Sequence, residues 1–204
     1  MVAIDPAVSS GEHSDEIGII VAGRTAEGHG YVLDDCSGRY QPEEWSARAV
    51  AAYHRYKADR IVAEKNQGGD MVQATIRAVG PDVPFHAVTA SRGKVVRAEP
   101  VSTRYEQLRI HHVGTFALLE DQMCSFTADF DRARAGYSPD RVDALVWALT
   151  ELVGGYEQPK INYGALAQTG PIFGPSRWGP SPDRPLGDRP TLTQSEISNW
   201  GSRY

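Results

Sequence analysis

Short apolar runs alternate with amphipathic segments over the first three quarters of the chain. Three runs rich in branched residues lie close together near the amino terminus, and their short spacing favours antiparallel hairpins. Further on, branched runs alternate with segments of helical period, a pattern typical of parallel strands joined by helices. The predicted strands are 2–4, 17–22, 31–33, 60–64 and 83–88, and the predicted helices are 42–57, 70–79, 97–109, 116–126 and 139–153. The pattern therefore predicts an α/β fold with a mixed five-stranded sheet flanked by helices, and a short extended piece at 110–113.

The character of the sequence changes after the glycine pair Gly154-Gly155. Seven of the chain's thirteen prolines lie from Pro159 onward, where neither a helical nor a strand period continues. Such a composition is typical of extended chain without a packed core. We therefore expect one domain over residues 1–157 and an extended Pro/Gly-rich tail over residues 158–204.

Length and charge narrow the choice of function. The 204 residues suit one domain with an appendage, and no run of about 18 apolar residues is present, so no membrane partner is expected. A net charge of −5 argues against a protein that binds DNA by charge alone. The two cysteines, Cys36 and Cys124, lie far apart in the sequence, which is typical of reduced thiols in a cytoplasmic protein.

Four carboxylates stand at the ends of predicted elements. Asp5 ends the first apolar run and Glu64 the fourth, so the two emerge side by side if those strands are neighbours. Asp140 and Asp143 are three residues apart near the start of the last helix and share a face. Taken singly, each has a plain explanation as a turn residue, an exposed strand end or a helix-dipole partner.

The combination of the four acids is more informative than any one of them. Several carboxylates at one place repel one another unless divalent cations neutralise them, and hard oxygen ligands favour Mg²⁺ or Mn²⁺. Two such ions can activate water and stabilise the leaving oxygen in phosphodiester hydrolysis. The sequence therefore predicts a two-metal site.

The motifs around these acids resemble the RNase H-like nuclease domain of the large terminases of tailed phages and gene-transfer agents. The likeness runs from about residue 2 to residue 153. It is carried by VAIDPA, SDEIGIIVAG, VAEKNQGGDMV, SRGKVVRAEPVSTRYEQLRIHHVG, LLEDQMCSF and SPDRVDALVWAL. The DxxDAL pattern also occurs in RuvC-type Holliday-junction resolvases, which share the fold. The resemblance implies an RNase H-like fold and an endonuclease that cuts concatemeric viral DNA during packaging, with two Mg²⁺ or Mn²⁺ ions.

The same resemblance implies roles for individual residues. By motif, Asp5, Glu64 and Asp143 are expected to be catalytic metal ligands. Asp140 is expected to be a further ligand or an auxiliary acid. Which aspartate of the DxxD pair is the principal metal ligand stays open. The basic residues of SRGKVVRAEP are expected to guide DNA through its phosphates, unless they form a solvated loop. These predicted DNA-binding residues are Arg92, Lys94 and Arg97.

The implied partners are double-stranded DNA, the terminase ATPase domain, the small terminase and the portal or procapsid. The sequence contains no GxxxxGK[ST] loop, so ATP hydrolysis is not expected of this chain. If the protein is viral, the expected location is the host cell cytoplasm. A RuvC-like junction resolvase, a ribonuclease H and a non-catalytic module that docks on the portal or on DNA remain alternatives.

Overall fold

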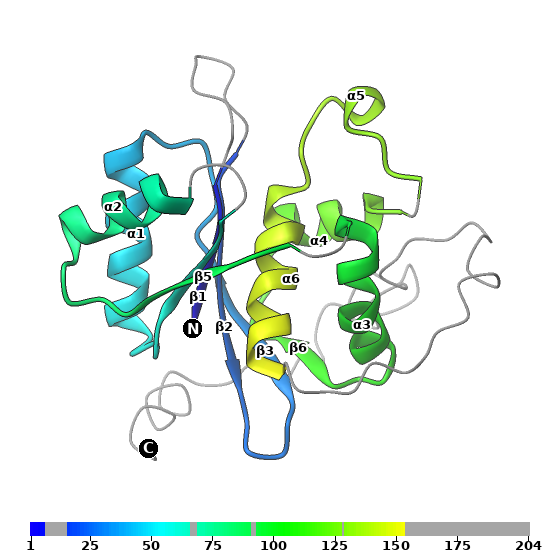
Figure 1. Ribbon diagram of the computed structural model, residues 1–204. Helices are drawn as coiled ribbons and strands as arrows, with labels where there is room; N and C mark the ends of the chain where they lie inside the picture. Colours follow the sequence, from blue (N-terminus) through cyan, green and yellow to red (C-terminus); the bar gives the residue numbers. More distant parts are fainter. Residues whose placement is uncertain (7–15, 66–68, 91–92, 128, 154–204) are drawn as a thin grey trace.

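The computed structural model describes residues 1–6, 16–65, 69–90, 93–127 and 129–153, and the predicted tail lies outside them. Three strands come first, helices and strands alternate after them, and three helices come last (Figure 1). In order they are β1 (Val2–Asp5), β2 (Gly18–Arg24), β3 (Gly30–Asp35), α1 (Pro42–Arg55), β4 (Ile61–Glu64), α2 (Gly69–Val79), β5 (Phe85–Val88), α3 (Lys94–Glu106), β6 (Ile110–His112), α4 (Ala117–Ser125), α5 (Arg132–Ala135) and α6 (Asp140–Val153).

The strands form one mixed sheet in the order β5-β4-β1-β2-β3-β6. The first three strands pair antiparallel, β1 with β2 and β2 with β3, as their short spacing predicted. The later strands are parallel additions, since β4 pairs with β1 and β5 pairs with β4. The predicted mixed α/β architecture is therefore confirmed, and the first and fourth strands are neighbours.

The sheet has six strands, so the predicted number of five was wrong. The extra strand is β6, which pairs parallel with β3 beginning at Gly30 opposite Ile110. Its three residues follow directly on the turn after α3, which is too short a run to show a strand period in the sequence. The extended conformation of β6 is stabilised by its pairing with β3.

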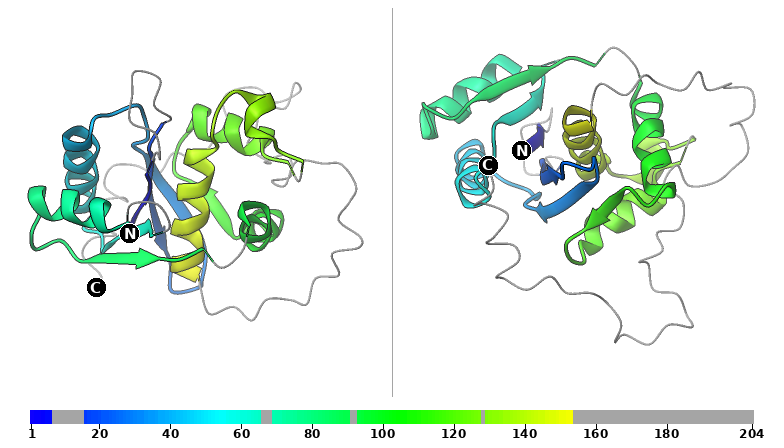
Figure 2. Two further views of the ribbon diagram at one scale, coloured as in Figure 1. Left: turned by 45° about the horizontal axis from the view of Figure 1, so that its top comes forward. Right: turned by 90° about the horizontal axis from the view of Figure 1, so that it is seen from below.

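Helices cover both faces of the sheet (Figure 2). Side chains alternate along β1, so Val2 and Ile4 pack with α1 and α2, whereas Ala3 packs with α3, α4 and α6. Helices cover β1 and β2 on both faces, which explains why both strands are continuous apolar runs in the sequence. Asp5 comes two residues after Ala3 and therefore faces the same side as α6.

Helix α6 is the central helix of its layer. Every residue from Asp140 to Leu149 is buried, because the helix lies between the sheet and the helices α3 and α4. Helix α3 begins at Lys94, three residues earlier than predicted, with Gly93 in extended conformation before it. The earlier start puts Lys94 and Arg97 one turn apart on one helix. None of the described helices is long and apolar enough to cross a bilayer.

Candidate metal centre

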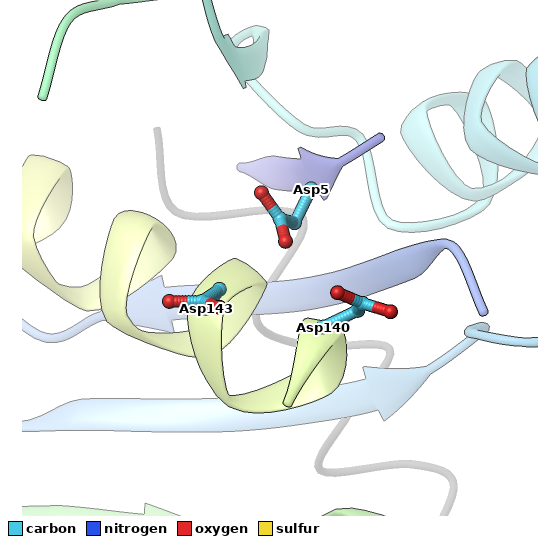
Figure 3. Close-up of side chains that lie close together, drawn as sticks. All are labelled: Asp5, Asp140 and Asp143. Atoms are coloured by element: carbon cyan, nitrogen blue, oxygen red, sulfur yellow. The ribbon is translucent and has the colours of Figure 1, made fainter. Parts of the chain in front are cut away.

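Three aspartates meet at the carboxyl end of β1. Asp5 closes β1, and Asp140 and Asp143 occupy the first turn of α6 (Figure 3). One carboxylate oxygen from each residue lies within 4.8 Å of the other two. All three residues are buried, with exposed fractions of 9%, 5% and 4% in chain order.

The local structure explains why these side chains converge. The strand alternation turns Asp5 toward the layer that contains α6. The helical spacing of three residues then places Asp140 and Asp143 on one side of α6, facing the end of β1. The three acids belong to segments more than 130 residues apart in sequence, and only the packing of α6 on the sheet joins them.

Burial makes this group of acids electrostatically unfavourable. The pKa of Asp5 lies well above its usual range because the side chain is buried and because Asp143, Asp140 and Glu64 are close by. The pKa of Asp143 is also raised by burial, although Lys94 and Arg97 oppose that shift. Three buried oxygen donors of this kind fit a hard divalent cation such as Mg²⁺ or Mn²⁺.

Lys94 extends from the first residue of α3 toward the aspartates. Its ammonium group donates a hydrogen bond to Oδ2 of Asp143. Burial alone would lower the pKa of Lys94, but the carboxylate of Asp143, with Asp5 and Asp140 behind it, raises the pKa instead. The Lys94 side chain is nevertheless 47% exposed, so it reaches the acids from the solvent side.

Glu64 lies next to the aspartates, and its carboxylate is held by two other side chains. Its Oε2 accepts hydrogen bonds from Arg97 Nη1 at 3.3 Å and from Trp147 Nε1 at 3.1 Å. The Arg97 guanidinium stacks 4.4 Å above the Trp147 ring and lies 3.8 Å from Asp143. The negative charge of Glu64 also contributes to the raised pKa of Asp5 and of Asp143.

The structure therefore groups Asp5, Asp140 and Asp143 directly, with Glu64 beside them. Of the predicted DNA-binding residues, Lys94 and Arg97 face these acids, and Arg92 lies outside the described residues. Trp147 is a residue of this site that was not predicted from the sequence. A signal was present, because Trp147 is four residues after Asp143 and so lies on the same side of α6.

Comparisons with known proteins found one family model and several solved structures that are similar to this chain. A family model described as "Terminase RNaseH-like domain" matches residues 2–152. RuvC from T. thermophilus, solved with a Holliday junction substrate, is 15% identical with a TM-score of 0.40, covering 74% of this chain and 92% of that one. The yeast mitochondrial Holliday junction resolvase is 11% identical with a TM-score of 0.44, covering 74% and 78%. No curated protein sequence matches the chain.

Proposed function

Because the chain belongs to the family of terminase RNaseH-like domains, we propose that it is a divalent-metal-dependent endodeoxyribonuclease that cuts concatemeric viral DNA during genome packaging. The RNase H-like fold expected from the sequence is the fold of this family. The observation that carries the proposal is the buried group of Asp5, Asp140 and Asp143, whose oxygen atoms lie within 4.8 Å of one another. A protein with no task for a cation would gain stability by replacing such acids.

The proposed cofactors are two Mg²⁺ or Mn²⁺ ions. Asp5, Asp140 and Asp143 would hold them, with Glu64 as the fourth ligand. Bound divalent cations would supply a Lewis acid that activates water and neutralises charge on the phosphate. Asp5, Glu64 and Asp143 are the proposed catalytic ligands. Asp140, three residues before Asp143 in the first turn of α6, completes the set.

The other side chains position these ligands and the substrate. Arg97 and Trp147 hold the Glu64 carboxylate, so its orientation is fixed before DNA arrives. Lys94 is half exposed at the same place, where it can donate to a phosphate oxygen. We propose that Lys94, Arg97 and Arg92 guide the DNA backbone. No side-chain nucleophile is needed, because water attacks the phosphorus.

The partners follow from this proposed function. Double-stranded DNA is the proposed substrate. The terminase ATPase domain, the small terminase and the portal or procapsid are the proposed protein partners. The net charge of −5 supports this arrangement, because a chain with this charge gains little DNA affinity from electrostatics by itself.

The proposal is tested by incubating the purified chain with supercoiled plasmid in Mn²⁺, Mg²⁺ or EDTA. The Asp143→Asn variant removes a proposed ligand, and Asp121→Asn, an exposed acid on α4, is the matched control. We expect metal-dependent nicking and linearisation by the wild type and the control, and none by Asp143→Asn. Metal-dependent cutting that persists in Asp143→Asn would contradict the proposal. Faster cutting of a four-way junction than of linear duplex would assign the chain to junction resolution instead.

A further inference from the structure

Arg141 sits between two of the proposed ligands in the chain, yet its side chain makes a different set of contacts. The side chain is only 5% exposed. A buried arginine is rare unless its charge is paired. Its partners therefore indicate what the first turn of α6 is attached to.

The Arg141 guanidinium joins α6 to the ends of two strands. Its Nε donates to Glu16 Oε2 at 2.9 Å and its Nη2 donates to Glu16 Oε1 at 3.1 Å, which makes a forked contact. Its Nη1 donates to Asp35 Oδ2 at 2.6 Å. Glu16 precedes β2 and Asp35 ends β3, so one side chain fixes the start of α6 to both strands.

The backbone of Arg141 is held by a different element. Its N–H belongs to the first turn of α6, where backbone donors have no partner within the helix. This N–H donates to Gln122 Oε1 on α4 at 3.2 Å. The first turn of α6 is thus attached to α4 through the backbone and to β2 and β3 through the side chain.

Gly18 allows the same turn to touch the sheet. It is the residue opposite Asp5 in the antiparallel pair of β1 and β2. A Cβ at position 18 would lie 2.0 Å from the carbonyl oxygen of Asp140 and 2.6 Å from its carbonyl carbon. Any side chain at this position would push the start of α6 away from β2, and Asp140 and Asp143 away from Asp5.

We propose that Arg141 is a positioning residue of the metal centre, which holds the first turn of α6 on the backbone of Gly18 so that Asp140 and Asp143 meet Asp5. The inference rests on the proposed function, since it assigns a supporting residue to that site. Arg141 is not one of the proposed ligands, and its guanidinium donates to Glu16 and Asp35. By pairing with Glu16 and Asp35, it also balances the charge of two carboxylates that lie before β2 and at the end of β3.

The test measures Mn²⁺ affinity without DNA, by calorimetric titration of the full chain well below its unfolding temperature. Arg141→Met removes the three hydrogen bonds to Glu16 and Asp35. Arg141→Lys keeps the positive charge but not the forked contact with Glu16. Glu16→Gln removes the charge of the partner that accepts two of these three hydrogen bonds; this side chain is 28% exposed, and the variant serves if Arg141→Met fails to fold. Arg60→Met is the matched control, because Arg60 pairs with Glu151 at 3.1 Å near the other end of α6.

We expect Arg141→Met to weaken Mn²⁺ binding about 10- to 100-fold, with smaller losses in Arg141→Lys and Glu16→Gln. Arg60→Met is expected to lower the unfolding temperature and leave Mn²⁺ affinity unchanged, as a purely structural ion pair would. Wild-type affinity in a folded Arg141→Met variant, or in both milder variants, would overturn the inference. Absence of Mn²⁺ binding by the wild type would overturn the inference and the proposed function together. Mn²⁺ binding that depends on Arg141, without DNA cutting, would overturn the proposed function alone.

Discussion

Lys94 and Asp143 form an ion pair across the candidate metal centre, from the first residue of α3 to the first turn of α6. The ammonium group thus interacts with one of the carboxylates that a divalent cation would use. The two partners differ in exposure, since the lysine side chain is 47% exposed and the aspartate side chain 4%. The lysine can therefore move away while the aspartate stays in place.

Lys94→Met is expected to bind Mn²⁺ several-fold more tightly than the wild type in the absence of DNA. The cation then no longer has to displace an ammonium group from Asp143. Calorimetric titration measures the change. Lys57→Met, which alters a lysine in the turn after α1, is the control and is expected to bind as the wild type does. Weaker Mn²⁺ binding by Lys94→Met would mean that Lys94 orders the site rather than competing for it.

Arg97 interacts with the acids in a more rigid way than Lys94. Its side chain is 12% exposed, it stacks on Trp147, and it donates to Glu64. Arg97→Lys loses the planar stacking and the approach of two guanidinium nitrogens to Glu64 and Asp143, so we expect a loss of about 1–3 kcal/mol in the free energy of unfolding.

Chemical unfolding measures this difference, and the chain offers a matched control. Arg48 stacks 4.5 Å above the Tyr40 ring but is exposed to solvent. Arg48→Lys is expected to change the free energy of unfolding by no more than about 0.5 kcal/mol. Equal losses in Arg97→Lys and Arg48→Lys would show that the contacts of Arg97 with Glu64 and Trp147 add nothing.

The raised pKa of Asp5 gives a pH dependence with a definite sign. Burial, together with the charge of Asp143, raises that pKa in the folded protein. Between the unfolded and folded pKa values the folded state binds more protons, so this group lowers the stability of the metal-free protein as pH rises. Asp5→Asn removes the effect. It is expected to stabilise the metal-free protein by on the order of 1 kcal/mol at neutral pH and above.

Urea unfolding in EDTA across the acidic to mildly alkaline range measures this effect. The advantage of Asp5→Asn over the wild type is expected to shrink as pH falls toward about 4, where an unfolded aspartate is protonated. Saturating Mn²⁺ is expected to stabilise the wild type and to have less effect on the variant. An advantage that stays the same at every pH would contradict this explanation.

DNA binding by the isolated chain is expected to be weak. The net charge is −5, and Lys94 and Arg97 already interact with carboxylates. A titration of the Asp143→Asn variant with duplex DNA should give a Kd of roughly 10⁻⁶ to 10⁻⁴ M that weakens as salt is added. Tight binding that resists salt would contradict the idea that other parts of a packaging motor supply most of the affinity.

Most of the backbone arrangement could be predicted from the sequence. Asp5 and Glu64 each end an apolar run, and short spacing distinguished the antiparallel strands from the helix-linked parallel ones. Parallel pairing of β1 with β4 then brings the ends of both strands to one edge. The sequence also predicted that Asp140 and Asp143 share a face of their helix.

The side-chain contacts of the site could not be predicted in the same way. Arg141 pairs with Glu16 and Asp35, which are more than 100 residues away in sequence, and no local pattern specifies such contacts. Strand β6 was missed as a strand because three residues do not establish a period. The orientation of Lys94 toward Asp143 depends on the packing of α3 against α6, which follows from tertiary structure alone.

The central claim is that Asp5, Asp140 and Asp143 form a divalent cation site. Anomalous diffraction from crystals of the chain grown with Mn²⁺ tests it most directly, with Asp143→Asn crystals as the comparison. We predict an anomalous peak among the three carboxylates in the wild type, within about 2.0–2.4 Å of their oxygens, and its loss in the variant. A site that holds no Mn²⁺ at millimolar concentration, or a peak that persists unchanged in Asp143→Asn, would contradict the account.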